Sequence, residues 1–198
     1  MSIKITTLVE NSVYGKGLQG EHGLSLLVDT GEHRLLFDTG ASDLFIRNAR
    51  ILGIDLKEVD FLVLSHGHRD HTGGLHHFLA VNDKAQVVCK RELFQPKFKD
   101  ERENGVMQPD ALDSTRFRFV DEVTELCRSV FVFPQLPVTD EEDTHFEHFF
   151  TWAEGRKQAD TFTDELALVL KQGAEVSVLG ACSHRGITNI IRAVQEYF

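Results

Sequence analysis

The first forty residues alternate between short apolar runs and turn-forming residues. Residues 3–9 alternate apolar and polar positions as a half-buried strand does, and the glycine-rich stretch 11–23 predicts a loop. Residues 24–29 and 34–37 are apolar runs on either side of a Thr-Gly-Glu turn, which predicts a hairpin. We expect its second strand to end sharply at Asp38, because a threonine and a glycine follow.

A helix and a buried strand are predicted next. Ser42 fits an N-cap, and Gly53 fits the position just after a helix. The apolar positions between them recur at helical spacing: Leu44, Phe45, Ala49 and Leu52. Residues 61–64 form a continuous apolar run, which is typical of a strand buried on both faces. A short helix around 75–79 and a strand at 86–89 follow.

The middle of the chain is less regular. Residues 95–115 are polar and weakly patterned, and we expect a long loop of the kind that is usually functional or mobile. The pattern predicts strands at 116–120 and 129–133. Residues 137–164 are acidic and irregular, and they predict no definite element.

The end of the chain again has a clear pattern. Residues 166–170 and 176–179 predict a second hairpin around a Gln-Gly pair. A helical stripe then follows at positions i, i+3, i+4 and i+7: Ile187, Ile190, Ile191 and Val194. Strands and helices mix along the chain, so the predicted fold class is α/β or α+β, with sheets covered by helices. We expect one domain over residues 1–198, with an irregular insertion around 95–160.

Composition and charge narrow the class of protein. The chain has 198 residues, of which 41% are hydrophobic and 26% charged, the balance of a globular protein with a buried core. Its formal net charge of -10 argues against nucleic acid or an anionic membrane as a partner. Basic side chains between residues 90 and 102 alternate with acidic ones, so we interpret them as a solvated face: Lys90, Arg91, Lys97, Lys99 and Arg102.

The cysteines and the N-terminus bear on the compartment. Cys89, Cys127 and Cys182 have no motif spacing, which favours a reducing environment over a disulfide framework. The N-terminus has no signal-peptide pattern, and no apolar run is long enough to cross a membrane. We therefore predict a cytoplasmic protein with no membrane partner.

The densest chemistry lies in the segment HGHRDH. His66, His68, Asp70 and His71 fall within six residues, and imidazole and carboxylate groups are good ligands for zinc, manganese or iron. At a frequency of about 0.05 for each residue type, four fixed positions arise by chance only ~10⁻³ times in a chain of this length. A histidine-rich exposed turn is the non-functional alternative.

The position of this segment favours a metal site. It follows the predicted strand 61–64, and open α/β folds place their sites at the carboxyl ends of strands. His66 and His68 can point the same way from extended backbone, whereas Asp70 and His71 diverge, so one loop can feed two metal positions. We expect one or two divalent ions, zinc first, which activate a water molecule. Asp70 is the predicted catalytic residue, which orients that water or accepts its proton.

A second candidate segment is GACSHRG. It also lies between a predicted strand and a predicted helix, and we predict His184 as a further metal ligand, against a helix-capping or structural histidine. Cys182 is a weaker candidate, because a lone cysteine is often a small buried hydrophobe. Asp38 either holds a ligand histidine through its second ring nitrogen or forms a simple Asx turn. Four further histidines are less persuasive candidates: His76, His77, His145 and His148.

Several segments together resemble a known family. HxHxDH after an apolar strand, with LLFDTG upstream, resembles the metallo-β-lactamase superfamily. With VENS, SHGHRDHTGGL, DELALVL and GACSHRGITNII added, the chain is similar to one branch, the metal-dependent hydrolases that resemble 7,8-dihydropterin-6-yl-methyl-4-(β-D-ribofuranosyl)aminobenzene-5'-phosphate synthase. The resemblance implies an αββα sandwich with a one- or two-metal site. It also implies a hydrolase or transferase that acts on a small anionic substrate, although fold alone does not choose the reaction.

The chain departs from that family at its end. Family members continue to a GGFHL-like segment whose histidine completes the second metal position, whereas this sequence ends at Phe198. We therefore expect a C-terminally shortened fold in which the second position is incomplete or is completed by a partner chain, so a homo-oligomer stays open. The alternatives to a hydrolase are a non-catalytic relative that binds metal or ligand, and a di-iron redox protein, which normally needs a flavin module that 198 residues cannot hold.

Overall fold

The computed structural model describes residues 3–106 and 114–198, and these residues form two compact units. Unit 1 consists of three segments: Met1–Leu64, His68–Val88 and Val106–Arg118. Unit 2 consists of the other three: Ser65–Gly67, Cys89–Gly105 and Phe119–Phe198. The HGHRDH segment therefore contributes its first histidine to unit 2 and its last four residues to unit 1. The prediction of one domain stays a prediction.

A six-stranded sheet runs through unit 1, in the order β1-β2-β3-β4-β5-β8. Its strands are β1 (Lys4–Val9), β2 (Ser25–Asp29), β3 (Arg34–Phe37), β4 (Phe61–Val63), β5 (Gln86–Cys89) and β8 (Phe117–Phe119). The first three are antiparallel, which confirms the predicted hairpin, whereas β3, β4 and β5 are parallel. The apolar runs of β3 and β4 are buried on both faces, as the sequence predicts.

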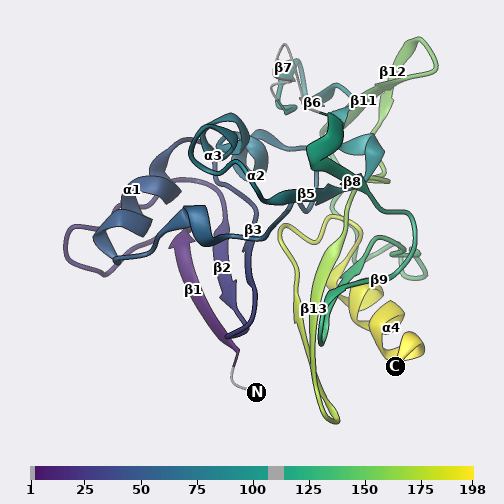
Figure 1. The fold of residues 1–198 in the computed structure, drawn as a ribbon. Coiled ribbons are helices and arrows are strands. Elements are labelled where there is room, and N and C mark those ends of the chain that lie inside the picture. Colours follow the sequence, from purple (N-terminus) through teal and green to yellow (C-terminus); the bar gives the residue numbers. More distant parts are fainter. Residues whose placement is uncertain (1–2, 107–113) are drawn as a thin grey trace. The chain divides into compact units, whose positions relative to one another are not determined.

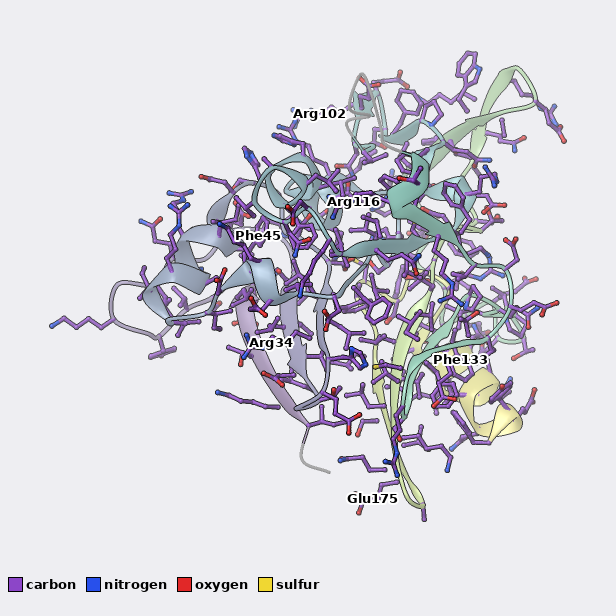
Figure 2. All side chains as sticks on the ribbon, viewed as in Figure 1. Arg34, Phe45, Arg102, Arg116, Phe133 and Glu175 are labelled. Atoms are coloured by element: carbon purple, nitrogen blue, oxygen red, sulfur yellow. The ribbon has the colours of Figure 1, made fainter. Side chains whose placement is uncertain are left out.

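Three α-helices accompany this sheet in unit 1: α1 (Leu44–Ile51), α2 (Arg69–Thr72) and α3 (Leu75–Val81). Figure 1 shows them grouped together beside the strands. Phe45, labelled in Figure 2, is fully buried on α1. The N-cap of α1 is Asp43 rather than the predicted Ser42, whose hydroxyl oxygen accepts the Leu44 N–H and whose O–H donates to Glu21. Gly53 follows the helix at φ +69°, as predicted.

A four-stranded antiparallel sheet forms the larger part of unit 2, in the order β14-β13-β10-β9. Its strands are β9 (Thr124–Cys127), β10 (Val130–Phe133), β13 (Ala167–Gln172) and β14 (Glu175–Leu179), and β13 and β14 form the predicted hairpin. Helix α4 (Ile187–Tyr197) packs Ile190 and Val194 into one core cluster with Phe133. Figure 1 shows the ribbon of α4, and Phe133 is labelled in Figure 2. Ile187 and Ile191 are 46% and 41% exposed, so only half of the predicted stripe is buried.

A second four-stranded sheet in unit 2 corrects the expectation of a long loop. It has the order β12-β11-β6-β7 and consists of β6 (Lys97–Lys99), β7 (Arg102–Glu103), β11 (Phe149–Ala153) and β12 (Arg156–Ala159). The physical reason is non-local pairing, since Phe98 lies opposite Phe150 and neither segment carries a strand pattern of its own. Residues 107–113 of the predicted loop lie outside the described residues.

The remaining regular elements are single 3-10 turns: η1 (Leu56–Glu58), η2 (Arg91–Phe94) and η3 (Ser114–Arg116). None of the helices within residues 3–106 and 114–198 combines the length and the hydropathy that crossing a membrane requires.

Candidate metal centre

The unit 1 part of HGHRDH is a loop that becomes a short helix. His68 has extended backbone at the N-cap of α2, and its carbonyl oxygen accepts hydrogen bonds from the backbone N–H groups of His71 and Thr72. The Thr72 hydroxyl donates to the same carbonyl at 2.9 Å. Gly73 is required next, because a Cβ there would lie 2.3 Å from the Ala41 carbonyl oxygen. The last residues of the motif are thus fixed by backbone contacts.

Asp38 orients the ring of His71. Its Oδ2 atom lies 2.7 Å from Nδ1 of His71, and both side chains are buried. An ionised carboxylate only accepts, so Nδ1 carries the hydrogen and donates it, and Nε2 keeps the lone pair that a metal would bind. Asp38 has φ +60°, a conformation that aspartate tolerates better than most residues. The predicted contact between Asp38 and a candidate ligand is therefore present.

Asp70 lies among imidazoles in unit 1. Its Oδ2 atom is 3.4 Å from Nε2 of His71 and 3.4 Å from Nε2 of His22. Burial raises the pKa of this carboxyl, but the hydrogen bond with His71 and the charges of His71 and His68 lower it to about 2. Asp70 is therefore a carboxylate at neutral pH, as a metal ligand must be. The sequence pattern gives no signal for His22, which is solvent-exposed.

Unit 2 brings His66 and His184 together. A ring nitrogen of His66 lies within 4.8 Å of a ring nitrogen of His184, and the two ring centroids are 5.1 Å apart. Their Nε2 atoms are buried, and the Ser65 hydroxyl lies 2.9 Å from Nδ1 of His66. The Cys182 sulfur is also within 4.8 Å of a His66 ring nitrogen, although Cys182 is exposed. The residues that the sequence singled out at 66, 182 and 184 thus meet within one unit.

His184 is held on several sides. Nδ1 lies 3.0 Å from the His145 carbonyl oxygen, which only accepts, so this ring too carries its hydrogen on Nδ1 and keeps a lone pair on Nε2. Phe162 stacks on the ring with centroids 3.8 Å apart. The backbone N–H of His184 donates to Glu165 at 2.8 Å. Burial raises the pKa of Glu165 to about 7, against the lowering effect of the N–H groups of Arg185 and His184.

A buried cluster of charged side chains supports Gly67, which lies between His66 and His68 in the sequence. The Gly67 N–H donates to Asp164 Oδ2 at 2.7 Å, and a Cβ at Gly67 would lie 2.4 Å from the Leu93 carbonyl oxygen. Lys97 Nζ is 2.7 Å from both Asp164 Oδ1 and Asp160 Oδ2. The interpretation of Lys97 as part of a solvated face is wrong, because its side chain is fully buried. Sequence reasoning assigned no role to the two aspartates.

The four weaker candidates for metal ligands have contacts other than those of the proposed ligands. His145 contributes its carbonyl oxygen to His184, while its side chain is exposed. Nδ1 of His148 lies 3.0 Å from Asp100 on the surface. His76 and His77 contact each other on α3, with ring centroids 3.8 Å apart.

A family model described as the metallo-β-lactamase superfamily matches residues 18–164. The chain belongs to this superfamily. The matched region begins before β2 and ends at Asp164, so it contains the complete HGHRDH segment. The resemblance inferred from the motifs is thereby confirmed.

Individual relatives agree with the superfamily assignment. A crystal structure described as a metal-dependent hydrolase of the β-lactamase superfamily is 33% identical, with a TM-score of 0.84, and the match covers 100% of this chain and 72% of that one. This likeness confirms the α/β metallo-β-lactamase-like fold class. The 7,8-dihydropterin-6-methyl-4-(β-D-ribofuranosyl)-aminobenzene-5'-phosphate synthase of Methanocaldococcus jannaschii is 28% identical over 210 residues, which cover 96% of this chain and 71% of the relative.

Two further relatives extend the comparison. An uncharacterized protein of Methanocaldococcus jannaschii is 28% identical over 192 residues, which cover 94% of this chain and 72% of that protein. The crystal structure of a metallo-β-lactamase from Novosphingobium pentaromativorans has a TM-score of 0.51 at 18% identity, covering 88% of this chain and 66% of that one. This last likeness concerns the fold alone.

Each unit of this superfamily member contains donors that fit a divalent metal. Unit 1 has the buried imidazoles of His68 and His71 and the ionised carboxylate of Asp70, and unit 2 has the buried imidazoles of residues 66 and 184. In two of the imidazoles, those of His71 and His184, an oxygen acceptor fixes the hydrogen on Nδ1, the arrangement in which metal-ligating histidines are commonly found.

Proposed function

We propose that this chain is a metal-dependent hydrolase of the metallo-β-lactamase superfamily that acts on a small anionic substrate. The proposed metal ligands are His66, His68, Asp70, His71 and His184. Zinc is the first choice for this imidazole-rich set, with manganese and iron as alternatives, and with one or two ions bound. The supporting observation is that Nδ1 of His71 and Nδ1 of His184 each have an oxygen acceptor, as metal-ligating histidines almost always do.

The residues of the chain then have distinct roles. A divalent metal held by these ligands would supply a water molecule of lowered pKa and would polarise a carbonyl or phosphoryl oxygen of the substrate. Asp38 and the His145 carbonyl keep their imidazole partners in the ligating orientation. Asp70 presents a carboxylate that would orient the attacking water, so we propose it as the catalytic residue. Phe162 covers one face of His184 and excludes solvent there.

Transfer to an acceptor other than water is the alternative reaction. It is supported by the name of the Methanocaldococcus jannaschii relative, which is a synthase. That name also includes a pterin and a phosphate, so a substrate that carries one of these groups belongs to the proposal.

Metal content tests the proposed site. We expect elemental analysis of the purified full chain to find one or two zinc, manganese or iron ions per chain. His68→Ala should lose most of this metal, because it deletes a direct ligand, whereas His76→Ala removes an exposed histidine of the same unit and should keep it. Unchanged metal content in His68→Ala would overturn the ligand assignment.

Turnover tests the catalytic part of the proposal. On a panel of carboxylic esters and phosphoesters, Asp70→Asn should lower kcat by about 10²-fold or more while changing KM less, because its carboxylate acts on the reacting water. A wild-type rate in this variant would show that Asp70 is not near that water. Full metal content without turnover on any substrate would favour a non-catalytic metal-binding relative instead.

A further inference from the structure

A cationic pocket lies within unit 2 beside the segment that carries His184. Its volume is about 360 Å³, which falls in the range of small-molecule sites. Among the described residues that line it, Lys90 and Arg185 are charged and the others, including Thr163, are uncharged. The described part of the lining thus has two cations and no acid, although the formal net charge of the chain is -10. The lining therefore selects for a negatively charged group.

Both cations are held at the wall by backbone carbonyl groups. Lys90 Nζ donates to the Pro134 carbonyl at 3.1 Å, which uses one of its three hydrogens. Arg185 donates from Nε to the Leu136 carbonyl at 2.6 Å and from Nη1 to the Thr161 carbonyl at 2.7 Å. These bonds fix the side chains before any ligand arrives. The other hydrogens on Nζ of Lys90 and the hydrogens on Nη2 of Arg185 can donate to an oxyanion.

The two positive charges also act on each other. Burial lowers the pKa of Lys90, and the charge of Arg185 lowers it further, whereas three nearby acids raise it: Glu92, Asp164 and Asp121. None of these acids is among the described residues that line the pocket. An anion bound between Lys90 and Arg185 would relieve their repulsion, and a phosphomonoester dianion matches two cations better than a carboxylate does.

The pocket and the metal-ligand region share two short segments. Arg185 directly follows His184, and Thr163 lies between Phe162, which stacks on His184, and Asp164, which holds Gly67. Arg185 is therefore one residue along the chain from a proposed metal ligand. This adjacency of Arg185 and His184 suits a substrate that is anchored at one end and reacts at the other.

We propose that Lys90 and Arg185 bind the phosphate group of a small phosphomonoester and so anchor the substrate whose reacting bond is processed at the metal centre. The binding of phosphate is a property of unit 2 alone. The anchoring of a substrate for reaction rests on the proposed function.

Titration calorimetry on the full chain, stripped of metal by a chelator, tests the anchor. Inorganic phosphate should bind saturably, and Lys90→Gln and Arg185→Lys should each weaken it by roughly tenfold, the latter because an ammonium cannot replace the guanidinium fork. Lys99→Gln removes an exposed charge of the same unit and should leave the Kd within about twofold. Absence of saturable binding, or equal weakening in Lys99→Gln, would overturn the proposal.

Two further measurements distinguish a substrate anchor from a site for free phosphate, and the anchor from the metal centre. Phenyl phosphate should bind more tightly than inorganic phosphate if the pocket anchors a larger molecule, and equal affinities would assign it to free phosphate and overturn the substrate anchor. Metal titration of the same samples reports on the metal centre independently, so phosphate binding without metal binding would refute the proposed function alone. Should Arg185→Lys fail to fold, as judged by circular dichroism, Lys90→Gln decides.

Discussion

At the scale of single residues, the candidate metal centre depends on which ring nitrogen of each histidine carries the hydrogen. Asp38 and the His145 carbonyl oxygen set this for His71 and His184, because neither oxygen can donate. The motif HxHxDH names the ligand candidates but not their tautomers. Asp38 is 33 residues away from His71 in the sequence, so only the fold pairs them.

Asp38→Asn tests this orientation. Asparagine adopts positive φ about as readily as aspartate, so the backbone at φ +60° is retained. The loss of the charged acceptor should weaken metal binding by roughly 10–100-fold, the usual effect of such supporting residues. Metal affinity is measured by competition with a chromophoric chelator. Asp43→Asn, an exposed acid of the same unit, is the control, and equal effects in both variants would contradict the role of Asp38.

At the scale of elements, the sheet formed by β6 and β11 brings a lysine into the interior. Lys97 is buried between Asp160 and Asp164, and Asp164 in turn holds the Gly67 N–H. Burial lowers the pKa of Lys97, but the two aspartates more than offset this and raise it above its ordinary value. The lysine is thus charged, and β6 is tied to the loop that carries His66.

Lys97→Met should lower the free energy of unfolding by about 3–5 kcal/mol, because two carboxylates stay buried without their cation. Urea unfolding at pH 7 measures this, and Lys99→Met, on the exposed side of β6, should change it by less than about 0.5 kcal/mol. An unchanged unfolding midpoint in Lys97→Met would refute the role of the cluster.

The pH dependence of stability provides a second test of Lys97. A raised folded pKa means that its stabilisation is fully present below the unfolded value of about 10.5 and is lost as pH rises through the folded value. The wild type should therefore lose more stability than Lys97→Met above pH ~10.5. If the free energy of unfolding depends on pH in the same way in both proteins above pH ~10.5, Lys97 has the same pKa in the folded and the unfolded chain, and the prediction is wrong.

At the scale of the whole molecule, the chain consists of two compact units, and the proposed ligands are distributed between them. Unit 1 contributes His68, Asp70 and His71, and unit 2 contributes His66 and His184. A metal bound by the ligands of either unit would bind the native chain more tightly than the unfolded one, because folding positions those ligands. Metal binding is then linked to stability.

Thermal unfolding measures this linkage. Free metal at 100 times its Kd should stabilise the native chain by about 2.7 kcal/mol, and a chelator should reverse the rise in Tm. His68→Ala should show little of this rise, whereas His76→Ala should show all of it. A metal-induced rise in Tm that is equal in His68→Ala and the wild type would mean that the metal binds elsewhere.

Local patterns in the sequence were sufficient to predict several elements and the superfamily. The apolar runs predicted β1 to β5 and the hairpin of β13 and β14, and the spacing of His66, His68, Asp70 and His71 indicated the superfamily. These predictions succeeded because alternation and helical periodicity record which side of a segment is buried.

The pairing of polar groups, in contrast, could not be predicted before the fold was known. The sequence pattern predicted Lys97 as a surface residue, whereas it lies on β6, which pairs with β11. The backbone N–H of Gly67 donates to Asp164, which is 97 residues away in the sequence. Ile187 and Ile191 fit a buried stripe, yet the packed face of α4 is that of Ile190 and Val194. The physical reason is that a hydrogen bond or an ion pair depends on which segments the fold brings together, and no local pattern specifies that partner.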